Sequence, residues 1–181
     1  MASWYGHPYH GRRAANGEIY DMEKFTAAHR TLPLGTWVEV VNLSNHRTVR
    51  VQVTDRGPFV EGRIIDLSRA AARQIAMLGP GTAKVRITVI APPKEPPKGD
   101  LFAVQVGAFR DRANAERLQK EMKERYGECR LAVREGEPRL FRVLVGQEPA
   151  IEKANELAER LRTELGAAFV VRLDAAAADV L

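Results

Sequence analysis

The chain has 181 residues, of which 45% are hydrophobic and 28% are charged, a composition that can bury a core and is typical of a globular protein. No apolar run approaches the ~20 residues of a membrane helix, and a single cysteine, Cys129, excludes an intrachain disulfide framework and a thiolate-only zinc site. The net charge of +5 lies in residues 1–91, which carry 12 Lys and Arg against 7 Asp and Glu, and this excess favours a nucleic acid or another acidic polymer as partner.

Short strand patterns recur in the first half of the chain. Residues 36–41 are rich in Val and Trp, and residues 48–54 and 85–89 alternate β-branched with polar side chains, the period-2 pattern of half-buried strands. Ser68 is suited to cap a short helix over residues 69–77. Many strands with one short helix predict a small β-barrel.

A proline-rich segment separates the two halves. Four of the six residues 92–97 are proline, which removes backbone donors and favours extended geometry. We therefore predict a semi-rigid linker over residues 92–100, between one domain at 1–91 and a second at 101–174. The alternative is a surface loop within a single domain. The Ala-rich tail at 175–181 is expected to fray.

The second half follows the order strand, helix, strand, strand, helix, strand. The split βαβ pattern that results is that of ferredoxin-like and RNP-like α+β domains. Because both helices must cover one face of the sheet, the other face is left for binding. The predicted elements are a strand at 101–109, a helix at 111–126, a hairpin of 131–134 and 140–145 across 135–138, a helix from Pro149 to Gly166, and a strand at 169–173.

Titratable side chains gather with glycines and aromatic residues in three separate segments of the first half. They supply Glu18, His29 and Asp55 from different loops, which is how binding clefts on β scaffolds are usually built. Each also has a plain structural explanation: a turn for Asp55, a satisfied core position for His29, and a bond to a loop backbone for Glu18. The other histidines show no metal-ligand spacing, so we expect no metal and no cofactor.

Several motifs of the first half occur in a fixed order: SWYG, HGR, ANGE-x-YDM, TAAH-x-TLP-x-GT, DRGPF and GRIIDLS. FAVQVGAF, the helix start ANAERL and FRVLVG follow in the second half. With these motifs the chain resembles the rare lipoprotein A (RlpA) family over nearly its whole length. The resemblance implies two domains, an all-β double-psi β-barrel followed by a sporulation-related repeat (SPOR) domain with the α+β βαββαβ fold.

The resemblance also implies a murein lytic transglycosylase, which cleaves between N-acetylmuramic acid and N-acetylglucosamine without water and leaves a 1,6-anhydro end. One carboxyl group suffices, first as acid and then as base, whereas most glycosidases need two. By motif position this group is Asp55, while Glu18 and His29 are expected to orient it and tune its charge. Asp66, which the fold-related expansins also carry before Leu-Ser, is the second choice and otherwise caps the helix start.

Other residues of the matched motifs are expected to bind the glycan. Aromatic rings stack on the apolar faces of sugars, so Trp4, Tyr5 and Tyr20 are expected to line a groove, unless they fill the core of this small domain. Asn16 and Arg56 are expected to contact the glycan as well.

One position departs from the family pattern. The family usually has a threonine where this chain has Ala14. Without that hydroxyl the position offers no hydrogen bond to the substrate or to Glu18. The alternative function is an expansin-like protein that binds peptidoglycan without cleaving it. The family is exported, so we expect a periplasmic and septal location, a lipid anchor in the outer membrane carried by a longer precursor, and a monomer.

The resemblance implies that the second domain binds peptidoglycan strands stripped of stem peptides. Strand alternation predicts Gln105, Gly107 and Phe109 on the helix-free face, beside Arg142, where polar groups offer hydrogen bonds and Gly107 lets a sugar approach the backbone. An RNA reader needs stacked aromatic residues and a basic face, but residues 101–181 carry 14 acidic and 14 basic side chains, so no nucleic acid is expected. A protein contact is the alternative use of this face.

Overall fold

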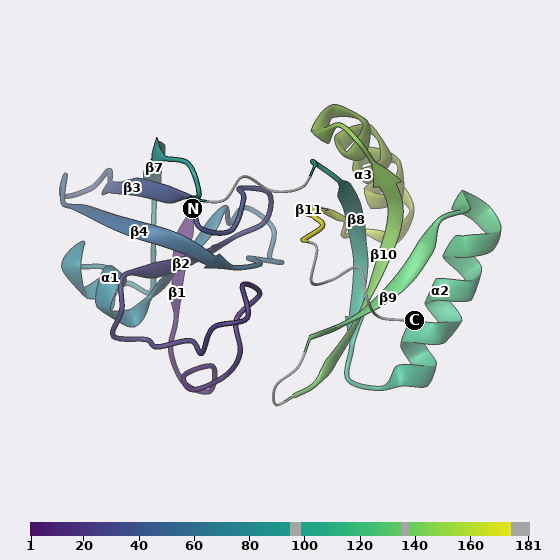
Figure 1. Cartoon of the computed structure of the whole chain (residues 1–181), viewed down its shortest axis with the longest axis horizontal. Coiled ribbons are helices and arrows are strands. Elements are labelled where there is room, and N and C mark those ends of the chain that lie inside the picture. The colour runs from purple at the N-terminus through teal and green to yellow at the C-terminus, as the bar shows by residue number, and fades with distance from the viewer. Residues whose placement is uncertain (95–98, 135–137, 175–181) are drawn as a thin grey trace. The chain divides into compact units, whose positions relative to one another are not determined.

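The computed structural model describes residues 1–94, 99–134 and 138–174. The chain divides into two compact units, Met1–Pro96 and Pro97–Leu181 (Figure 1). The middle of the predicted linker, most of the predicted hairpin turn and the predicted tail lie outside the described residues. Within the described ranges, no helix is long and apolar enough to cross a membrane.

The first unit is a seven-stranded mixed sheet with the order β6-β1-β5-β2-β4-β3-β7. The three strands predicted from alternation are present as β3 (Trp37–Asn42), β4 (Thr48–Asp55) and β7 (Val85–Ala91). Two neighbouring pairs, β1 with β5 and β2 with β4, run parallel within an otherwise antiparallel sheet. The strands that had no clear sequence pattern are β1 (Ala2–Tyr5), β2 (Thr26–His29), β5 (Ile65–Ser68) and β6 (Thr82–Ala83).

A short helix, α1 (Arg69–Gln74), covers the core of the first unit. It begins where predicted, because Ser68 Oγ accepts a hydrogen bond from a backbone N–H of the first turn at 3.2 Å. It ends earlier than the predicted residue 77, since Ala76 has a φ of 54°, which a right-handed helix cannot contain. The fully buried core side chains of this unit include Val38, Val51 and Leu67.

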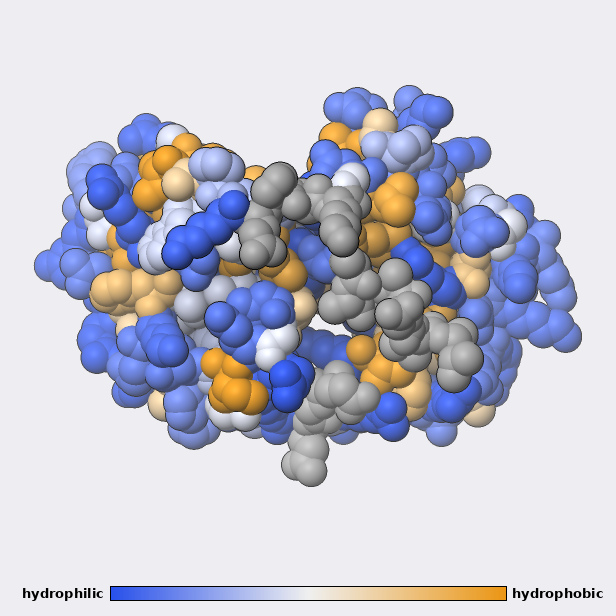
Figure 2. Space-filling view, in the orientation of Figure 1, coloured by the Kyte–Doolittle hydropathy of each residue, from blue (hydrophilic) through white to orange (hydrophobic). Residues whose placement is uncertain are grey.

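The second unit confirms the predicted element order. Its antiparallel sheet has the order β11-β8-β10-β9. Both helices pack on one face, because Met122 and Leu161 share a core cluster with Val104 and Val143 of the sheet. The opposite side of α2 is hydrophilic in Figure 2. The elements are β8 (Phe102–Phe109), α2 (Arg112–Tyr126), β9 (Cys129–Arg134), β10 (Leu140–Glu148), α3 (Ile151–Leu165) and β11 (Phe169–Arg172).

The predicted face of two residues on β8 is wrong. Val143 pairs with Gly107 and the next residue, Leu144, pairs with Gln105, so β8 contains one extra residue at this point. Such a bulge inverts the alternation beyond it. Gln105 keeps the helix-free face, but Gly107 and Phe109 turn toward the helices, and Phe109 packs against the core. Neither residue therefore belongs to the free face of the sheet.

Replacing Gly107 by alanine is expected to lower the free energy of unfolding of the second unit by about 1–3 kcal/mol, the usual cost of overpacking. A Cβ at this position would lie 2.6 Å from Phe109 Cε2 and 3.0 Å from Leu118 Cδ2. Far-UV circular dichroism measures this unit, which holds both long helices. Ala108→Ser, on the exposed neighbour, is the control, and equal stability of the two variants would contradict the bulge.

Candidate active site

The candidate site lies on the side of the first sheet that faces away from the core. Ala28 of β2 pairs with Asp66 of β5 on one side and with Asp55 of β4 on the other. Paired residues project from the same face, and a register shift after Ala27 and Val53 turns Asp55 out of the core. Two carboxylates thus flank the Ala28 methyl group, roughly 10 Å apart at twice the strand spacing.

Asp55 is held in one orientation at the end of β4. Its side chain is only partly accessible, with 9% of the residue exposed. Oδ1 accepts hydrogen bonds from the backbone N–H groups of Ala15 at 3.1 Å and Arg56 at 2.8 Å. The bond to Arg56 is the predicted local turn contact, but the bond to Ala15 joins a segment 40 residues away.

The loop that carries Glu18 is fastened to the same strand end. The backbone N–H of Asn16 donates to the carbonyl of Thr54 at 3.1 Å, and Ala14 N–H donates to the carbonyl of Glu18 at 2.8 Å. The Asn16 side chain donates to Glu18 Oε2 at 3.0 Å and accepts from the Glu18 N–H at 3.1 Å. Glu18 is exposed, and Asn16 sets its orientation.

His29 ends β2, which runs parallel to β4, so both strands end at the same edge of the sheet. Its Nδ1 accepts hydrogen bonds from the N–H groups of Thr31 at 3.2 Å and Leu32 at 3.1 Å, and the ring proton is therefore on Nε2. Burial, with the charges of Arg56 and Arg30, lowers the pKa of His29 to about 4. At neutral pH the ring is an uncharged donor through Nε2.

Arg56 and Asp66 are both held by other groups of the protein. Arg56 is 6% exposed, and its Nη1 donates to the carbonyls of His29 at 2.9 Å and Leu32 at 2.8 Å. The buried guanidinium thus links the end of β4 to the end of β2. Asp66 Oδ1 accepts from Ser3 Oγ at 2.5 Å, and Oδ2 pairs with Arg63 at 3.2 Å. The helix cap is Ser68, so the capping role considered for Asp66 is wrong.

The aromatic residues predicted to line a groove are largely buried: Tyr20 is 4% exposed and Tyr5 is half-buried. Trp4 packs against the core of the first unit. The Tyr5 ring stacks on Tyr20 with centroids 4.3 Å apart and meets Tyr9 edge-on at 5.9 Å. The Tyr20 hydroxyl donates to the Tyr5 carbonyl at 2.7 Å. Burial raises the pKa of Tyr20, and the negative charge of Asp55 adds to this shift.

The helix-free face of the second sheet carries more positive charge than its neutral composition suggested. Leu144 pairs with Gln105 on β8 and with Arg130 on β9, and alternation adds Arg134 and Arg142 to this face. Burial lowers the pKa of Arg130. Gln105 Oε1 and Arg130 Nη2 are buried without a hydrogen-bond partner among the described residues, which is a sign of a polar ligand site.

Some site residues had escaped the sequence analysis. Arg134 follows from simple alternation with Ala132 on the predicted strand 131–134, whereas Arg130 lies one residue before its predicted start, because β9 begins at Cys129. Ser3, which holds Asp66, had no such signal, because it depends on the pairing of β1 with β5, whose residues are 63 positions apart. Within the described ranges, no group of three potential metal ligands occurs.

Known protein families match both units. Residues 1–87 match the family model described as a lytic transglycolase, and residues 98–172 match the SPOR domain. Together with the two folds, these matches define the class of protein: a double-psi β-barrel followed by an α+β SPOR domain, as predicted.

Curated relatives agree with this class. A Campylobacter jejuni protein named endolytic peptidoglycan transglycosylase RlpA is 42% identical over 147 residues, which cover 68% of this chain and 54% of that protein. A Helicobacter pylori protein of the same name is 40% identical over 168 residues, covering 91% and 49%. Among solved structures, a Streptomyces papain inhibitor covers 50% of this chain at 27% identity with a TM-score of 0.41. The chain belongs to the RlpA family and spans about half the length of these curated relatives.

Proposed function

We propose that this chain is a murein lytic transglycosylase in which Asp55 acts first as general acid and then as general base. The observation that carries the proposal is one fixed carboxylate, with Oδ1 bound by two backbone N–H groups, at the sheet edge where β2 also ends at His29 and to which the Glu18 loop is fastened. The activity named for the relatives, endolytic peptidoglycan transglycosylase, agrees with it.

The reaction needs one proton carrier. Protonated Asp55 donates its proton to the glycosidic oxygen as the bond from that oxygen to the muramoyl anomeric carbon breaks, and N-acetylglucosamine leaves with a hydroxyl group. The muramoyl C6 oxygen attacks the same carbon, and the Asp55 carboxylate takes the C6 proton. No water is consumed, and Asp55 ends protonated. We assign the proton to Oδ2, and we assign His29 Nε2–H as a neutral hydrogen-bond donor to a sugar oxygen.

A hydrolase is the second candidate, because the Asp66 carboxylate lies on the same face as Asp55, across Ala28. Inverting glycosidases use two carboxyl groups about 6.5–9.5 Å apart, one as acid and one as base for water. Both oxygens of Asp66 are occupied, by Ser3 and Arg63, and such bonds weaken a base. A weak second base favours the transglycosylase, which needs only one carboxyl group.

The products of digestion separate the candidate functions. The wild-type chain is incubated with amidase-treated and untreated sacculi, and soluble fragments are analysed by mass spectrometry. The proposal expects 1,6-anhydro-muramoyl ends. Ordinary reducing ends would support the hydrolase, and binding without soluble fragments would support the expansin-like binder.

We further propose that the second unit directs the enzyme to septal glycan stripped of stem peptides, in the cell envelope, where cleavage aids the separation of daughter cells. Removing stem peptides leaves lactyl carboxylates on the muramoyl residues. The arginines of the helix-free face are suited to bind carboxylates, and Gln105 is suited to bind acetamide groups. Anchoring in the outer membrane through a lipid and a monomeric state belong to the same proposal.

Replacing Arg130 by glutamine is expected to weaken binding to amidase-treated sacculi by about tenfold, because a buried charge-assisted hydrogen bond is lost. Co-sedimentation measures the affinity. Arg160→Gln removes an equal charge from the exposed side of α3 and is expected to leave binding unchanged. Equal losses in the two variants would indicate attraction by overall charge and would contradict the assigned face.

A further inference from the structure

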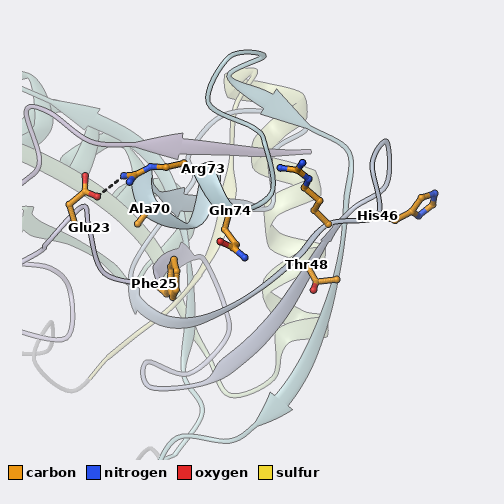
Figure 3. Close-up of a pocket in the computed structure, with 8 residues that line it drawn as sticks. Glu23, Phe25, His46, Thr48, Ala70, Arg73 and Gln74 are labelled. Carbon is orange, nitrogen blue, oxygen red and sulfur yellow. Dashed lines mark hydrogen bonds and ion pairs between the residues drawn. The ribbon is translucent and has the colours of Figure 1, made fainter.

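The first unit contains a cavity of about 710 Å³ that the proposed reaction does not use (Figure 3). Its lining includes Phe25, Arg47, Thr48, Arg73 and Gln74. Thr48, in one wall, begins β4 and lies seven residue steps or about 23 Å from Asp55, which ends the strand, whereas Phe25, in the other wall, bonds to Gln52, three steps or about 10 Å from Asp55. The cavity is therefore a separate place on the same unit.

The wall of this cavity is held in position by bonds between distant segments. The turn between β3 and β4 is fastened to the end of α1, because the side-chain amides of Asn42 and Asn45 donate to the carbonyl of Ile75 at 3.0 and 3.1 Å. In this turn His46 has a φ of 58°, a left-handed conformation that is uncommon outside glycine and persists where surroundings enforce it. The turn thus fixes the backbone of Arg47 beside the helix.

The cavity carries a positive charge that the protein leaves largely uncompensated. Glu23 pairs with Arg69 at 3.0 Å and with Arg73 at 2.5 Å, and these two arginines lower the pKa of its carboxyl group. No hydrogen bond or ion pair joins the Arg47 guanidinium to any described residue of the chain. The lining therefore holds two arginines, Arg47 and Arg73, and one carboxylate, Glu23, which is already paired, so the Arg47 guanidinium remains for a ligand.

The remaining lining suits a sugar-linked ligand. Phe25 is 47% exposed, and in Figure 3 its ring lies beside the Gln74 amide, with Thr48 across from them. An exposed ring gives a stacking surface, the amide and hydroxyl groups give hydrogen bonds, and a guanidinium binds carboxylate with two parallel bonds.

We infer that this cavity is a second binding site of the barrel, for a carboxylate-bearing part of peptidoglycan. The inference rests on the proposed function, which makes peptidoglycan the polymer this unit meets. Two parts of that polymer carry the required group: the lactyl carboxylate of stripped glycan and the carboxylates of stem peptides. In either case the barrel holds its polymer at a place about 10–23 Å along β4 from the residue that cleaves it.

Nuclear magnetic resonance of the ¹⁵N-labelled full chain tests the site directly. The chain carries Asp55→Asn so that ligands stay intact, and it is titrated with stripped glycan oligomers, with the free stem tetrapeptide and with chitooligosaccharide, which has no carboxylate. Amide signals of Arg47, Thr48, Arg73 and Gln74 are expected to shift with one or both carboxylate probes and not with chitooligosaccharide. Silence of these signals with both carboxylate probes would overturn the inference.

A matched pair of variants tests the role of the guanidinium. Arg47→Gln is expected to weaken the binding measured from these signals by about fivefold, the size of one solvent-screened charged contact. The control is Arg50→Gln. Arg50 is also exposed, lies three residues further along the chain and is paired with Glu39, so its replacement is expected to change the binding little. Equal effects would overturn the inference. If the wild-type chain cleaves glycan but the amide signals of the cavity residues do not shift, only this site is refuted. If the signals shift but no cleavage occurs, only the proposed reaction is refuted.

Discussion

Asp55→Asn is expected to lower the rate of soluble product release from sacculi by about 10²–10⁴-fold, the usual contribution of a general acid–base group. Asparagine keeps an oxygen at the Oδ1 position, so the hydrogen bonds from Ala15 and Arg56 can persist and the fold should be retained. The amide cannot give or take the proton. Mass spectrometry of 1,6-anhydro ends gives the rate, and tryptophan fluorescence checks the fold of the first unit, which contains Trp4 and Trp37.

Asp66, the second carboxylate beside Ala28, supplies the decisive comparison. Asp66→Asn removes a group that Ser3 and Arg63 already hold, so it is expected to affect stability more than the proton transfer itself. Asp21→Asn, on a partly exposed aspartate, controls for the loss of one negative charge. If Asp66→Asn abolished product formation while Asp55→Asn retained it, the acid–base role would belong to Asp66.

The second unit was predictable from the sequence almost element by element. Its strands and helices are long enough for their apolar periods to be recognised. The wrong faces on β8 result from one extra residue in the strand. Alternation assigns faces by position, and a bulge reverses the assignment beyond it with no local sequence signal other than Gly107. The close approach that requires a glycine at position 107 is that of the Phe109 and Leu118 side chains, not of the predicted sugar.

The first unit was predictable only in part. β1 and β2 are four residues each, and tertiary pairing rather than local pattern makes them strands. Motif order brought Glu18, His29 and Asp55 to attention, and the structure brings the Glu18 loop and the end of β2 to the strand that Asp55 ends. The burial of Arg56 could not be predicted, because it depends on carbonyls 24 and 27 residues away.

The stability of the first unit is expected to fall as the pH falls below 6.5, and His29 is the cause. Its pKa in the folded chain is about 4, against 6.5 for an ordinary histidine. Between these values the unfolded chain takes up a proton that the folded chain cannot accept, so acid favours unfolding. The stabilisation due to His29 is fully present above pH 6.5. Between pH 7.5 and pH 5 the free energy of unfolding is expected to fall by about 2 kcal/mol as this stabilisation is lost.

His29→Asn removes this dependence while keeping an acceptor near the position of Nδ1 for the N–H groups of Thr31 and Leu32. Denaturation followed by tryptophan fluorescence at several pH values isolates the first unit, and the variant is expected to lose the part of the slope due to His29. His46→Gln, in an exposed turn, is the control and should keep the slope. A wild-type slope in His29→Asn would mean that His29 titrates normally and carries a positive charge in mild acid, and the neutral-donor role proposed for Nε2 would then fail.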